Sequence, residues 1–162
     1  MKRIISLILV FVMIFALAAC GKEEAAEPAT LGQELYADFT AKVNAGETDA
    51  QAIVDALLSS GLLPFEGGMS AEMEEGFLMG FSADIEGFDK AVMFGPMIGA
   101  IPFVGYVFEL GSAEESEAFC AKLLENADPR WNICTEADET VCGSVDNLVF
   151  FVMCSNQAEE AE

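Results

Sequence analysis

Histidine is absent from this chain, and basic residues are scarce. Of its 162 residues, seven are lysine or arginine, whereas 28 are aspartate or glutamate. Because there is no imidazole, the Ser-His and Cys-His nucleophile pairs of many hydrolases are excluded. Because there is no basic stripe to neutralise phosphates, we expect no nucleic acid as a partner.

Other catalytic and metal-binding patterns are also missing. Ser82, in Gly-Phe-Ser-Ala-Asp, lacks the second glycine of a nucleophile elbow. Asp84, Glu86 and Asp89 lack the glycine and the terminal glutamate that complete a calcium loop. No two cysteines have the short spacing of redox or zinc sites. We therefore expect no catalytic residue, no metal and no cofactor, and predict that the protein is not an enzyme.

An apolar segment opens the chain. Lys2 and Arg3 precede residues 4–16, which are apolar except for Ser6 and too short to span a bilayer comfortably. The segment ends in Leu-Ala-Ala-Cys at residues 17–20. This stretch resembles the lipobox of bacterial lipoproteins, in which the cysteine after the cleavage site accepts a diacylglycerol group. The resemblance implies a lipoprotein signal peptide at residues 1–19 and lipidation of Cys20.

The resemblance also implies a location, namely the extracytoplasmic face of the cell membrane. Two or three acyl chains, palmitate among them, are needed there because one chain anchors only marginally, at about 0.8 kcal/mol per buried methylene. Loss of the signal leaves five basic and 28 acidic residues, a formal charge of −23. Such a charge repels anionic lipid headgroups, so we expect the covalent lipid alone to attach the protein to the membrane.

The exported part divides into three segments. Residues 20–30 hold the lipidated cysteine and an acidic tether that has no large apolar side chain to pack. Residues 31–154 form a single predicted domain, and residues 155–162 a disordered acidic tail.

The domain is expected to begin with two helices. Apolar residues recur at helical spacing from Leu31 towards Gly46, and Asp49 caps a second helix that ends at Gly61. Residues 70–75 are predicted to form a short helical turn.

Strands are predicted next. Residues 91–108 are uncharged and long enough for a membrane-spanning helix. Pro96 and Pro102 favour instead two strands, at 90–94 and 103–110, and the membrane span is the alternative. A capping box at Ser112 begins another helix, which Pro129 ends. The last strands are predicted at 131–135 and 145–154.

This order predicts an α+β fold, with two N-terminal helices followed by a mainly antiparallel sheet and one packed helix. Residues 148–153 are apolar on both faces, so they are expected in the middle of the sheet. The layout is similar to that of small exported lipoproteins of unassigned function in Gram-positive bacteria.

Two residue types suggest chemistry. The four cysteines that remain after Cys20 predict two disulfides. A hairpin centred on Asp138 would pair Cys134 with Cys142, which leaves Cys120 for Cys154; four free thiols are the alternative. Methionine thioethers, at 69 and 73 and again at 93 and 97, are soft ligands that suit Cu(I), but core filling is the preferred interpretation.

The sequence therefore predicts a lipid-anchored extracytoplasmic protein that serves as a non-enzymatic binding or envelope-associated module, with an envelope protein as a partner. One alternative is a small substrate-binding lipoprotein that assists a transporter, although such proteins usually close two lobes around a ligand. A carboxylate-based envelope enzyme is the third hypothesis.

Overall fold

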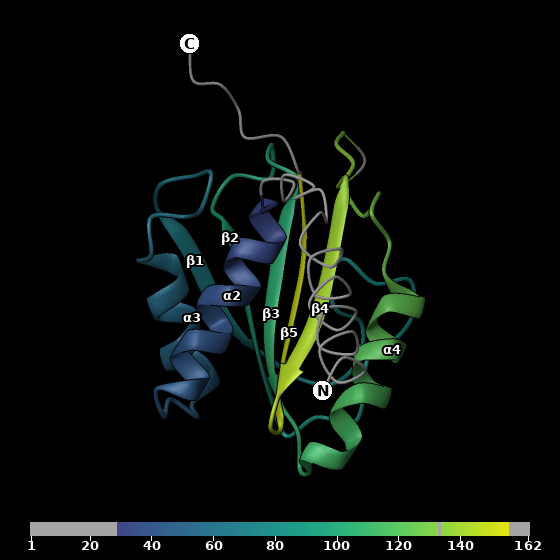
Figure 1. Cartoon of the computed structure of the whole chain (residues 1–162). Helices are drawn as coiled ribbons and strands as arrows, with labels where there is room; N and C mark the ends of the chain where they lie inside the picture. Colours follow the sequence, from purple (N-terminus) through teal and green to yellow (C-terminus); the bar gives the residue numbers. More distant parts are fainter. Residues whose placement is uncertain (1–28, 133, 156–162) are drawn as a thin grey trace, which may run out of the picture.

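The computed structural model describes residues 29–132 and 134–155 (Figure 1). The predicted signal peptide at 1–19, Cys20, tether residues 21–28 and tail residues 156–162 lie outside the described residues. The predicted domain at 31–154 is described in full except for Ile133.

A five-stranded sheet forms the centre of the domain, and every neighbouring pair of strands is antiparallel. The strand order is β1-β2-β3-β5-β4. The strands are β1 (Gly68–Met73), β2 (Lys90–Pro96), β3 (Phe103–Glu109), β4 (Glu139–Val145) and β5 (Leu148–Cys154). The predicted α+β fold with an antiparallel sheet is confirmed, and β5 lies inside the sheet, where its two-faced apolar sequence predicts it.

Two helices cover one face of the sheet, and a third helix packs on the other (Figure 1). The first two are α2 (Leu31–Asn44) and α3 (Ala50–Leu58). The third, α4 (Ser116–Asn126), follows a 3-10 turn, η1 (Ala113–Glu115). Asp49 caps α3 by accepting a hydrogen bond from the backbone of Ala52, as its sequence position predicts.

Thr30 belongs to the domain rather than to the predicted tether. Its side chain accepts a hydrogen bond from the backbone N–H of Gln33, and the Gln33 side chain accepts one from the Thr30 backbone. This reciprocal pair is a capping box, which fixes the start of α2. The domain therefore includes at least one residue more at its N-terminal side than the sequence indicates.

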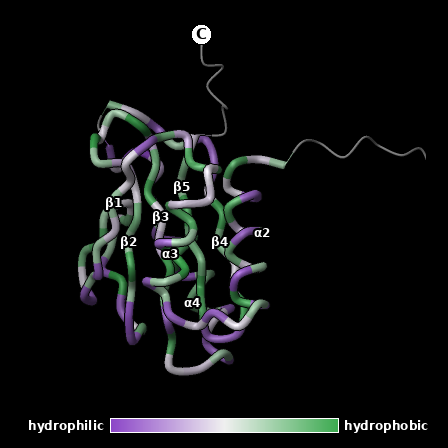
Figure 2. Tube along the Cα trace, turned by 90° about the vertical axis from the view of Figure 1, so that its left-hand side faces the viewer, coloured by the Kyte–Doolittle hydropathy of each residue, from purple (hydrophilic) through white to green (hydrophobic). Residues whose placement is uncertain are grey.

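The uncharged run at residues 91–108 forms strands β2 and β3 and the turn between them, as predicted. Hydrophobic residues fill the middle strands over most of their length (Figure 2). Two buried clusters result, one on each face of the sheet. None of the helices within residues 29–132 and 134–155 is long and apolar enough to cross a membrane.

Two secondary-structure predictions are wrong. Residues 70–75, predicted as a helical turn, lie mostly in β1. Residues 131–135, predicted as a strand, form bends and a turn around the undescribed Ile133, and the strand begins later, at Glu139.

The hairpin between β4 and β5 turns at Asp146 and Asn147, where Asp146 has a φ of 52°. Left-handed backbone at this position suits a tight hairpin turn, so the strand predicted from residue 145 starts at Leu148.

The predicted disulfide pairing is wrong as well. Cys120 on α4 is bonded to Cys142 on β4, with their Cα atoms 6.0 Å apart, whereas Cys134 is exposed and Cys154 is buried as free thiols. Asp138 is not the centre of a hairpin, because Cys142 lies within β4 and pairs across the sheet with Phe151. Cys142 is bonded to Cys120 because it lies on the side of β4 that faces α4.

We expect Cys142→Ser to lower the free energy of unfolding by about 3 kcal/mol, because the bond closes a 22-residue separation and restricts the unfolded chain. Denaturant titration of the oxidised protein measures this change. Cys134→Ser removes an exposed thiol and serves as the control, with an effect below about 0.5 kcal/mol. Equal effects of the two substitutions would show that Cys120 and Cys142 are not bonded.

Candidate functional site: a methionine-lined pocket

One corner of the sheet lies open on the face that carries α4. Helix α4 packs on β4 and β5, and Phe81 covers the middle of the same face, with its ring 5.7 Å from that of Tyr106 and 4.8 Å from that of Phe151. Neither covers the ends of β1 and β2 next to the β2–β3 turn. A pocket of about 440 Å³ occupies this corner.

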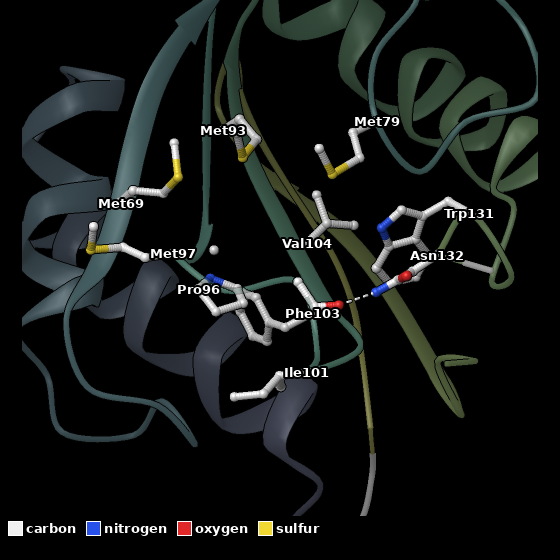
Figure 3. A pocket seen from close by; sticks show the side chains of 12 residues that line it. Met69, Met79, Met93, Pro96, Met97, Ile101, Phe103, Val104, Trp131 and Asn132 are labelled. Atoms are coloured by element: carbon white, nitrogen blue, oxygen red, sulfur yellow. Dashed lines mark hydrogen bonds between the residues drawn. The ribbon is translucent and has the colours of Figure 1, made fainter. Parts of the chain in front are cut away.

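The pocket is lined mainly by apolar groups from several segments (Figure 3). Its lining residues are Met69, Met79, Met93, Gly95, Pro96, Met97, Gly99, Ile101, Phe103, Val104, Trp131 and Asn132. None of these described residues carries a charge. We call this site the methionine pocket.

The strand register brings the methionines together. Met69 on β1 lies opposite Gly95 on β2, and Ala71 lies opposite Met93. Residues that differ by two positions along a strand share a face, so Met69 and Met93 are diagonal neighbours over the pocket. Gly95 lies between them in this pattern. A Cβ atom there would make only ordinary contacts, with Phe103, so the missing side chain leaves space in the floor of the pocket.

Tyr106 holds the segment that carries Met79. The Tyr106 hydroxyl donates a hydrogen bond of 2.8 Å to the backbone oxygen of Met79, on a segment that crosses this face of the sheet. Burial raises the pKa of Tyr106, which keeps the hydroxyl protonated and able to donate. Met79 is thereby held at the edge of the pocket by its backbone, and its side chain is half exposed.

The far side of the pocket is closed by the loop after α4. The Asn132 side-chain amide donates a hydrogen bond to the backbone oxygen of Gly99, which ties this loop to the β2–β3 turn. Trp131 precedes Asn132 and is the only tryptophan of the chain. Its indole therefore provides a fluorescence signal that comes from the pocket wall.

Core filling, the preferred interpretation of the methionines, is wrong for three of them. Met69 is 42% exposed, Met79 51% and Met97 73%. Figure 3 shows the sulfurs of Met69 and Met97 on one side of the pocket, with Met79 and Trp131 on the other. A preformed Cu(I) site would require the thioethers to converge on one point. Here they are spread around a wide opening instead.

The buried thiol of Cys154 does not form a reactive site. Cys154 is fully buried, and burial together with the Glu139 carboxylate raises the pKa of its thiol to about 12. A thiol that stays protonated in this way is a poor nucleophile. In the part of the chain that the structure describes, no group of three or more cysteine, aspartate or glutamate side chains is placed to hold a metal ion.

The sequence does contain a signal for the pocket. Met69 and Met73, like Met93 and Met97, are four residues apart. A separation of four places side chains on the same side of a helix, but it also places them on the same face of a strand. The alternation of Met69, Ala71 and Met73 with polar neighbours is a strand pattern, which indicates that these three side chains share one face.

Comparisons with known proteins add no assignment. No family model, curated protein or solved structure matches this chain. The function of the methionine pocket must therefore be inferred from its own chemistry.

Proposed function

We propose that this protein is a lipid-anchored, extracytoplasmic and non-enzymatic binding module, and that the methionine pocket is its binding site. The observation that carries this proposal is a pocket of about 440 Å³ whose wall is built from four thioethers and an indole. Ligand pockets in proteins usually have volumes of about 300–1,000 Å³ and predominantly apolar linings. The lipobox at residues 17–20 supports the anchor.

The lining determines the class of ligand. Among the described lining residues there is no charge, so an ionic group would lose its hydration without gaining a partner. Methionine side chains are unbranched and polarisable, and they adapt to ligands of irregular shape. The pocket therefore suits an uncharged, apolar ligand or the apolar part of a larger molecule.

Binding can be measured through Trp131. We expect 1-N-phenylnaphthylamine, an uncharged apolar fluorophore, to bind in the pocket and to accept excitation energy from the indole. Gly95→Leu adds four carbons to the pocket floor and should weaken binding roughly tenfold, since overfilling a packed site costs about 1–3 kcal/mol. The measurement is a titration of the sensitised emission.

Gly111→Leu is the matched control. Gly111 is exposed and outside the pocket lining, with Asp89 as its nearest neighbour, and its backbone is not left-handed. The Gly111→Leu substitution should leave the affinity for the fluorophore unchanged. If both variants bind as tightly as the unaltered protein, the methionine pocket is not the binding site.

A further inference from the structure

The methionine pocket and the root of the N-terminal segment lie at the same end of the domain. Glu139, the first residue of β4, accepts hydrogen bonds from the Thr30 hydroxyl and from the backbone N–H of Gly32. Across the sheet, Glu139 pairs with Cys154, and Cys154 pairs with Phe103, which lines the pocket. Two strand spacings, about 10 Å, therefore separate the backbone of Glu139 from that of Phe103, although α2 and the pocket lie on opposite faces of the sheet. Figure 1 shows the start of α2 and the β2–β3 turn at one end of the molecule.

The length of chain before Thr30 limits how far this end can lie from an anchored lipid. Thr30 lies ten positions after Cys20 in the sequence. A fully extended segment of that length spans at most about 35 Å. A lipid on Cys20 therefore keeps the start of α2, at the pocket end of the domain, within about 35 Å of the bilayer surface.

The rim of the pocket carries apolar side chains that face solvent. The β2–β3 turn, residues 97–102, contains no charged residue. Met97 is 73% exposed and Ile98 is 75% exposed on this turn. Exposed apolar groups at the end of a domain that is tied to a membrane are well placed to enter the interfacial region of the bilayer.

We infer that the ligand of the methionine pocket is the hydrocarbon tail of a membrane lipid, which enters while the β2–β3 turn contacts the bilayer. This inference rests on the proposed function, because it names the ligand of the same site and uses the Cys20 anchor. The tail is uncharged, flexible and apolar, as the lining requires. Carboxylates near the same end, including Glu66, Asp138 and Glu139, favour zwitterionic over anionic lipid surfaces.

The test uses the full lipidated protein in phosphatidylcholine vesicles whose acyl chains carry bromine, which quenches tryptophan at short range. We expect strong quenching of Trp131. Ile98→Ser removes an exposed rim side chain outside the pocket lining and should reduce the quenching several-fold. Gly95→Leu, which fills the floor, should reduce it as well. Leu124→Ser, at a 47% exposed position on α4, is the control and should leave quenching unchanged.

The possible outcomes separate this inference from the proposed function. If the fluorophore binds to the protein in solution but brominated tails leave Trp131 unquenched, the lipid-tail assignment is overturned and the binding pocket stands. If neither the fluorophore nor the lipid reaches Trp131, both fail. Quenching that is equal in the unaltered protein and in Gly95→Leu would place the tail outside the pocket and would also overturn the inference.

Discussion

Replacement of Cys20 by alanine is expected to abolish the incorporation of labelled palmitate into this protein. The lipobox resemblance assigns the acyl chains to the Cys20 sulfur. The sequence after residue 20 has no polybasic patch that could hold the protein on anionic lipid instead, so the variant should also lose stable membrane association. The measurement is metabolic labelling followed by separation of membrane and soluble fractions.

Cys134→Ala provides the control for this experiment, because Cys134 is an exposed free thiol that lies far along the chain from the lipobox. It should be labelled like the unaltered protein. Equal labelling of the Cys20→Ala protein would contradict the anchor and would remove the membrane-facing orientation inferred for the pocket.

Phe150→Ala is expected to lower the free energy of unfolding by about 4 kcal/mol. Phe150 is fully buried on β5, and its ring centre lies 5.4 Å from that of Phe39 on α2 and 6.5 Å from that of Phe94 on β2. Its loss removes contacts with two elements at once and leaves a cavity in a rigid part of the sheet. Denaturant titration measures the change.

Phe77→Ala is the same substitution at a 73% exposed position, and it should cost less than about 0.5 kcal/mol. A similar loss at both positions would mean that β5 does not form the buried centre of the sheet. Neither residue lines the methionine pocket, so fluorophore binding by the folded variants should be unaffected.

Local patterns in the sequence were sufficient to predict much of the fold. Asp49 marks the start of α3 because a carboxylate satisfies free backbone N–H groups at that point in any context. Pro96 and Pro102 indicate that residues 91–108 are not one helix, since proline disrupts a helix wherever it stands inside one. Each of these signals depends on residues that are close in sequence.

The disulfide and the pocket could not be predicted in the same way, because both depend on how strands pair. The partner of Cys142 depends on the side of β4 on which α4 packs, and residues between 120 and 142 give no direct sign of it. The four pocket methionines come from two strands, a loop and a turn. Their common location becomes visible only once the register of β1 against β2 is known.

The central claim is that an apolar ligand binds among these methionines, and their methyl groups test it directly. The protein without the proposed signal peptide, which contains Met1 and Met13, has six methionines, so ¹³C-methyl labelling should give six resolvable signals: Met69, Met73, Met79, Met93, Met97 and Met153. On titration with 1-N-phenylnaphthylamine, the aromatic rings should shift the signals of the four pocket methionines most. Met73, at the opposite end of β1 and about 13 Å along the strand from Met69, should stay in place. Unchanged signals from Met69, Met79, Met93 and Met97 at saturating fluorophore, or a shift as large at Met73, would contradict the account.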